Sequence, residues 1–90
     1  MAVIYADNNA TTALAPEVVD AMTPFFHELY FNPSSMYEAA RPVAAAIEQA
    51  RSAVAVLLGG IDPKQLLFTS GATESNNAVI FGAAKANRSR

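Results

Sequence analysis

One strand-like run between helical segments is the feature that most limits how this chain can fold. Residues 65–69 contain the apolar run Leu66-Leu67-Phe68, which is typical of a short buried strand. The segments on both sides have helical spacing, and a single strand cannot satisfy its own backbone N–H and C=O groups. We therefore expect the partner strands to lie outside these residues, which makes this chain a piece of a larger α/β protein.

Composition favours the same interpretation. The 90 residues are 52% hydrophobic and only 16% charged. A domain of this size has a high ratio of surface to volume and usually carries more charge. The chain is therefore either a compact alanine-rich bundle or part of a larger protein whose other residues cover its apolar faces, and we favour the second alternative.

Charge and residue usage argue against several classes of function. The net charge is −2 and no basic stripe is present, so a nucleic-acid partner is not expected. The apolar runs are far shorter than the roughly 20 residues that a membrane span needs, and residues 1–7 lack the features of a signal peptide. With no cysteine and one histidine, the chain predicts neither a disulfide nor a metal site of its own. The simplest location is the cytoplasm.

Proline and polar residues predict where the first two helices begin. Pro16 and an acidic residue after it suit a helix start, and Pro24 is expected to kink that helix or to begin a second short piece at Thr23. Ser35 and Glu38 have the spacing of a capping box, which predicts a long alanine-rich helix after them.

The long helix is expected over about residues 36–58, bent or delayed by Pro42 and stopped by Gly59-Gly60. A last helix is expected over residues 73–87, followed by the polar surface loop Arg88-Ser89-Arg90. The side of this helix that we expect to be buried consists of Val79, Ile80, Ala83 and Ala84.

The turn from Ser70 to Ser75, between the strand-like run and the last helix, is the best candidate site. A helix start has unpaired N–H groups and a dipole that favours negative charge, and Ser70, Thr73 and Ser75 add three hydroxyls. An anion site and a well-capped helix start are equally good interpretations, because strand-to-helix turns with glycine are common. The turn is not a P-loop, since no Gly-Lys-Ser/Thr follows, and its glycine spacing is not that of the dinucleotide fingerprint. Glu74 would repel a phosphate, so we expect it to point away or to meet a hydrogen-bond donor.

Other polar residues give weaker indications. Residues 7–12 are turn-forming and predict a surface loop, with the alternative that they lie across a site and offer amides to a ligand. His27, beside Glu28, is expected to be a solvated surface residue. Lys64 and Lys85 are expected to be exposed, so the chain shows no nucleophile–base pair and no complete catalytic set.

Taken together, the motifs resemble the N-terminal part of a cysteine desulfurase. This is the NifS/IscS-like group of class V aminotransferase-related enzymes, which use pyridoxal 5′-phosphate (PLP). The residues that carry the resemblance are Tyr5-Ala6-Asp7-Asn8-Asn9-Ala10-Thr11-Thr12, Pro16-Glu17-Val18-Val19, Phe25-Phe26, Asn32-Pro33-Ser34-Ser35, Ala50-Arg51 and Phe68-Thr69-Ser70-Gly71-Ala72-Thr73-Glu74-Ser75-Asn76-Asn77.

The resemblance implies an N-terminal fragment of a fold-type I PLP-dependent transferase, an α/β fold whose large domain has a mostly parallel sheet flanked by helices. Residues 1–14 would contribute to the small domain, and residues 15–90 would be the incomplete start of the PLP-binding large domain. By position in the family, Gly71, Ala72 and Thr73 would hold the cofactor phosphate through backbone N–H groups and the Thr73 hydroxyl. Asn8 and Asn9 would lie near the substrate.

The implied activity of the parent protein converts L-cysteine to L-alanine and passes sulfur on as a persulfide. The sulfur would go to an acceptor or scaffold protein, for iron–sulfur clusters or other sulfur-containing cofactors, and the parent enzyme would be a homodimer. The family's reactive lysine and cysteine lie later in its sequence, so we assign no catalytic residue here and expect the 90 residues alone to be inactive. A non-catalytic interaction domain or remnant of the family, and another PLP enzyme such as a selenocysteine lyase, are the alternatives.

Overall fold

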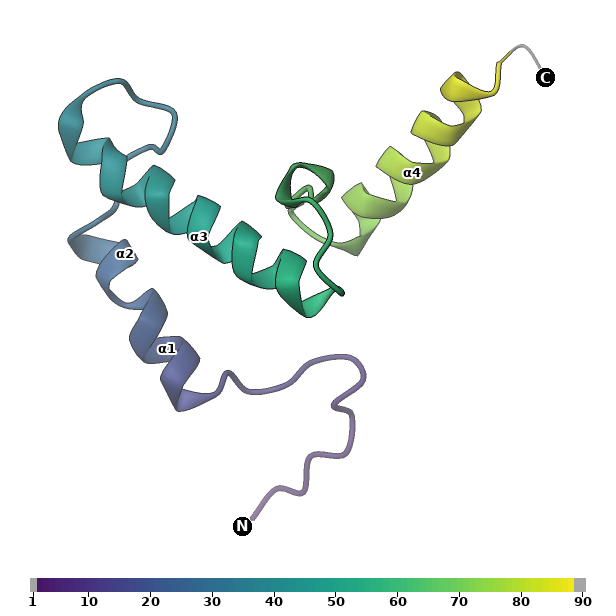
Figure 1. The fold of residues 1–90 in the computed structure, drawn as a ribbon. Helices are drawn as coiled ribbons and strands as arrows, with labels where there is room; N and C mark the ends of the chain where they lie inside the picture. Colours follow the sequence, from purple (N-terminus) through teal and green to yellow (C-terminus); the bar gives the residue numbers. More distant parts are fainter. Residues whose placement is uncertain (1, 89–90) are drawn as a thin grey trace. The chain divides into compact units, whose positions relative to one another are not determined.

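The computed structural model describes residues 2–88, which form helices without a paired strand (Figure 1). The chain divides into two compact units, Met1–Ala50 and Arg51–Arg90, and each is described by itself. Ser89 and Arg90, the end of the expected surface loop, lie outside the described residues. The helical elements in chain order are α1 (Pro16–Met22), α2 (Pro24–His27), the 3-10 helix η1 (Glu38–Ala40), α3 (Arg41–Leu57), the 3-10 helix η2 (Pro63–Gln65) and α4 (Ala72–Ala86).

Two prolines divide the first helical segment into α1 and α2. Pro16 occupies the start of α1, where a missing N–H costs nothing. Thr23 ends α1, and its backbone N–H and hydroxyl both donate to the Val19 carbonyl, at 3.0 and 2.7 Å. Pro24 then begins α2, because it has no N–H to continue the α1 ladder. The predicted second piece at Thr23 is confirmed.

The capping box predicted for the long helix is wrong. The backbone N–H of Ser35 donates to the Asn32 carbonyl at 3.0 Å, so Ser35 belongs to the preceding turn. The residue before η1 is Tyr37, and no side chain caps it. Glu38 lies 4.0 Å from Arg41 in a surface ion pair instead of reaching back to a backbone N–H. The proline that follows Arg41 suits the first turn of an α-helix, so α3 starts later than the pattern predicted.

Two glycines end α3, as predicted. Gly59 and Gly60 have φ values of +96° and +79°, which other residues adopt only at a cost. The N–H groups of Gly60 and Ile61 donate to the Ala55 carbonyl at 3.0 and 3.2 Å. These bonds satisfy a carbonyl that the end of the helix would leave unpaired.

The strand predicted at residues 65–69 is not formed within the described residues. Gln65 ends η2, and Leu66 has an extended backbone with φ −99° and ψ 122°. No regular secondary structure follows before Ser70, and the run Val3-Ile4-Tyr5 also remains without a partner. The physical reason is that strand conformation is stabilised by hydrogen bonds to a neighbouring strand, which residues 2–88 do not supply.

Few side chains are buried in either unit. Among residues 2–88, the buried apolar residues of the first unit are Ala40 and Val43, and the buried apolar residue of the second unit is Ala55. The expectation that one side of α4 is buried is wrong for this chain: Val79 and Ile80 are 70% and 63% exposed. Helices in proteins gain most of their stability by packing an apolar face, and the described residues provide no cover for this one.

Candidate functional site

The turn that leads into α4 is held by two hydroxyl groups. The Thr69 hydroxyl donates to the Gly71 carbonyl at 3.1 Å, and it lies 2.6 Å from the Ser75 hydroxyl. Thr69 and Ser75 are half-buried. These bonds connect the residue before the turn to the first turn of the helix, so the loop between them has a defined conformation.

Glu74 holds the other side of the turn. One of its carboxylate oxygens accepts from the Ser70 backbone N–H at 2.7 Å and from the Ser70 hydroxyl at 2.6 Å. The bond from the hydroxyl, and then that from the backbone, hold the pKa of the Glu74 carboxyl below its usual 4.5. The expectation that Glu74 meets a hydrogen-bond donor is confirmed.

The N-terminus of α4 keeps its backbone donors available. Gly71 precedes the helix with an extended backbone, and no side chain caps the helix. The first α-helical bond is donated by the Ser75 N–H to the Gly71 carbonyl, at 3.1 Å. The N–H groups of Ala72 and Thr73 therefore have no partner within the helix and point outward from its N-terminus, which is the positive end of the helix dipole.

The three hydroxyls of this turn have different roles. Those of Ser70 and Ser75 are occupied by Glu74 and Thr69. Within residues 2–88, the Thr73 hydroxyl has no hydrogen-bond partner. Thr73 is thus the one of the three whose hydroxyl is free to bind a ligand.

The space beside this helix start is open. A Cβ atom added at Gly71 would meet no atom within 4 Å. The Ala72 and Thr73 N–H groups and the Thr73 hydroxyl together give three donors at this helix start. Such a set of donors fits a phosphate group.

Arg51 is a residue of this region whose role the sequence did not reveal. Its side chain is half-buried, and its Nη1 donates to the Leu66 carbonyl at 2.5 Å. Its guanidinium carbon lies 4.9 Å from the centre of the Phe68 ring. The sequence marked Arg51 only as part of the motif Ala50-Arg51, and it gave no indication of a bond to a residue 15 positions later.

Asn8 and Asn9 form the middle of a turn in the other unit. The Ala10 N–H donates to the Asp7 carbonyl at 3.0 Å. The Tyr5 hydroxyl donates to the same carbonyl at 3.0 Å and also contacts the hydroxyl of the threonine that follows Ala10. The predicted surface loop is confirmed, and both asparagines are exposed. This turn belongs to the unit Met1–Ala50, and Gly71 belongs to the unit Arg51–Arg90.

The remaining polar residues do not assemble a second site in the part of the chain that the structure describes. His27 is exposed, with its Nδ1 3.8 Å from a Glu28 oxygen. Lys64 and Lys85 are exposed, as expected. Residues 2–88 contain no cluster of side chains suited to a metal ion and no helix long and apolar enough to cross a membrane.

Comparison with known proteins gives consistent matches along the chain. The family model for class-V aminotransferases matches residues 4–89. The cysteine desulfurase NifS of Azotobacter vinelandii is 46% identical over 90 residues, which is 100% of this chain and 22% of that protein. The mitochondrial cysteine desulfurase of Arthroderma benhamiae is 54% identical over 83 residues, covering 91% of this chain and 16% of the relative.

A second activity occurs among the similar proteins. The selenocysteine lyase of Homo sapiens is 49% identical over 82 residues, covering 91% of this chain and 18% of that protein. The chain thus spans about a fifth of the length of the relatives it matches. No solved structure gives a significant match.

Proposed function

Because the chain belongs to the class-V aminotransferase family, we propose that the complete protein is a PLP-dependent cysteine desulfurase. In this reaction the C–S bond of L-cysteine breaks, L-alanine is released, and the sulfur is held by a protein thiol as a persulfide. The observation that carries the proposal is the 46% identity to a cysteine desulfurase along the whole of this chain. The chain itself has no cysteine, so the accepting thiol belongs to residues outside it.

The helix start at Gly71, Ala72 and Thr73 is the part of the site that this chain contributes. Its uncapped N–H groups, its open approach and its free threonine hydroxyl fit the phosphate of PLP. When bound, PLP supplies an electron sink for negative charge on the substrate's α carbon. Ala72 and Thr73 would bind and orient the phosphate, and Glu74, held by Ser70, would stay out of its way.

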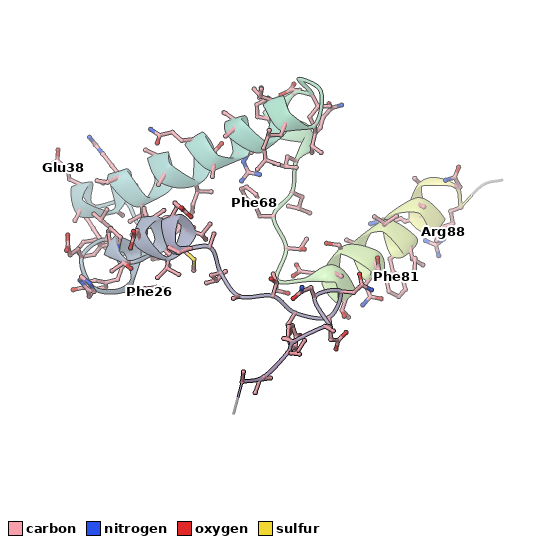
Figure 2. The ribbon with its side chains drawn as sticks, turned by 90° about the horizontal axis from the view of Figure 1, so that it is seen from below. Phe26, Glu38, Phe68, Phe81 and Arg88 are labelled. Carbon is pink, nitrogen blue, oxygen red and sulfur yellow. The ribbon has the colours of Figure 1, made fainter. Side chains whose placement is uncertain are left out.

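The fold proposed for the complete protein is the fold-type I PLP-dependent transferase. Residues 66–69 would become a strand of its mostly parallel sheet once neighbouring strands are present. The exposed apolar side chains of α4, among them Phe81, support this, because an apolar helix face of this kind needs a cover (Figure 2). Residues 1–14 would join the small domain, and residues 15–90 would begin the large domain.

Asn8 and Asn9 are proposed to lie near the substrate. The Tyr5 hydroxyl fixes the backbone of their turn, and their exposed side-chain amides can donate and accept hydrogen bonds. A turn held in this way can present amides to a polar substrate at small entropic cost.

The partners proposed for the complete protein are those of the cysteine desulfurase family. They are L-cysteine, a second copy in a homodimer, and an acceptor or scaffold protein that receives sulfur for iron–sulfur clusters or other cofactors. A cytoplasmic location is proposed as well, although one similar protein is named mitochondrial.

Turnover of L-cysteine by the complete protein tests the function. With a reducing thiol present, we expect L-alanine and sulfide in equal amounts. After the cofactor has been removed from the protein, formation of both products should depend on added PLP. The 90-residue chain is the matched control, and we expect no turnover from it at any PLP concentration. Absence of alanine from the PLP-loaded complete protein would refute the proposed activity.

A selenocysteine lyase is the second candidate, favoured by the 49% identity to two proteins of that name. Both activities break a bond between the β carbon and a chalcogen, so the helix start described here would serve either one. Separate kcat/KM values for L-cysteine and L-selenocysteine decide between them. Turnover of selenocysteine with no measurable turnover of cysteine would replace the first proposal with the second.

A further inference from the structure

The segment that leads into the candidate phosphate site is tied to α3 by one side chain. Residues 66–69 have no ladder of backbone bonds in the described part of the chain. Arg51 contacts this segment twice, through its bond to the Leu66 carbonyl at 2.5 Å and through the face of the Phe68 ring at 4.9 Å. Two contacts of different kinds fix both the position and the rotation of the segment.

Arginine is suited to this double contact. Its guanidinium group is planar, so one edge donates to a carbonyl while the face lies over an aromatic ring. A lysine ammonium can make either contact, but it has no flat face with which to make both. Arg51 is half-buried, whereas Phe68 is exposed.

A continuous set of contacts connects Arg51 to the donors of the site. Phe68 is followed directly by Thr69, whose hydroxyl bonds to the Gly71 carbonyl and lies 2.6 Å from that of Ser75. Those bonds orient the first turn of α4, where the Ala72 N–H is exposed to a ligand. A shift at Leu66 or Phe68 would therefore move the backbone donors.

We propose that Arg51 is a positioning residue for the phosphate site, acting through Leu66 and Phe68 on the start of α4. This inference rests on the proposed function, because it takes the phosphate of PLP as the ligand. We assign Arg51 no contact with the ligand, because its two described contacts are with Leu66 and Phe68. Its effect should therefore fall on the phosphate group of the cofactor and not on the pyridine ring.

The affinities of PLP and of pyridoxal, which lacks the phosphate, test this in the complete protein freed of its cofactor. Fluorescence titration gives both dissociation constants, and their ratio is the phosphate preference. We expect Arg51→Met to reduce this ratio about tenfold, the lower end of the loss seen when groups that orient a ligand's contacts are removed. Arg51→Lys should lose less, roughly threefold, because it keeps one of the two contacts.

Arg41→Met is the matched control. Arg41 lies on the same helix, and its surface ion pair with Glu38, at 4.0 Å, is remote in sequence from the turn. Its variant should keep the phosphate preference of the wild type. A general loss of stability would weaken PLP and pyridoxal binding alike and leave their ratio unchanged, so the ratio separates positioning from folding.

Each outcome decides one proposal. An unchanged ratio in both Arg51 variants refutes the positioning role while leaving the phosphate site in place. If Arg51→Met does not fold, the ratio for Arg51→Lys decides alone. A wild-type protein that binds PLP no more tightly than pyridoxal refutes the phosphate site itself, and with it the proposed function.

Discussion

Removal of the Thr73 hydroxyl is the sharpest test of the phosphate site. Thr73→Val keeps the shape of the side chain and the backbone N–H groups of Ala72 and Thr73, and deletes only the hydroxyl that has no partner among residues 2–88. The expected loss is therefore one hydrogen bond to a charged group. Such a bond contributes about 1.5–3 kcal/mol, which corresponds to a roughly 10- to 150-fold weaker dissociation constant for PLP.

The assay is a PLP titration of the complete protein freed of its cofactor, followed by fluorescence. Thr73→Ser retains the hydroxyl and should bind within a few-fold of the wild type. Ser75→Ala is the control for the conformation of the turn, because the Ser75 hydroxyl bonds to that of Thr69 and is not available to the ligand. If Thr73→Val binds PLP as tightly as the wild type does, the Thr73 hydroxyl is not a phosphate ligand. If Ser75→Ala weakens binding as much as Thr73→Val, the effect comes from the conformation of the turn.

The remaining predictions concern the turn before α4 and the helices α3 and α4. Because the pKa of Glu74 is lowered, its contribution to the turn is present above pH 4.5 and is lost as the pH falls through the lowered value. Ser70→Ala removes the larger cause and should raise the Glu74 pKa in a carboxyl NMR titration; an unchanged pKa would contradict the assignment. In the 90-residue chain, Gly60→Ala should destabilise the end of α3 by about 1–2 kcal/mol, since φ there is +79°. Gly82→Ala should stabilise α4 by about 0.5–1 kcal/mol, since a Cβ at Gly82 meets no atom within 4 Å. Amide hydrogen exchange in the two helices measures both effects. A stabilised α3 end in Gly60→Ala together with a destabilised α4 in Gly82→Ala would show that the backbone preference of glycine does not control them.

Features with a local cause were predicted well from the sequence. The break at Pro24 and the stop at Gly60 depend on single residues whose backbone preferences hold in any context. The contact of Glu74 with a donor was predicted from its charge at a helix start, and Ser70 supplies that donor. Each of these interactions joins residues at most five positions apart.

Features that need distant residues were predicted poorly. The run Leu66-Leu67-Phe68 has the composition of a strand, but composition cannot supply the neighbour that a strand requires. Val79 and Ile80 have the spacing of a buried helix side, yet both are exposed because no other element of residues 2–88 covers them. Spacing identifies an apolar face, whereas burial depends on what lies against it.

The sequence by itself determined the helix boundaries set by proline and glycine, the polar turn at Gly71 and the family of the chain. Each of these depends on the identity and order of the residues, and not on contacts between residues far apart in the sequence. Only the tertiary structure decided which donors of the turn are free and that Arg51 supports it. The reason is that a hydroxyl or a guanidinium group can bond to any of several neighbours, and only folding selects among them. Folding pairs Ser70 with Glu74 and Ser75 with Thr69, and among residues 2–88 it leaves the Thr73 hydroxyl without a partner. It also brings Arg51 to a carbonyl 15 residues away.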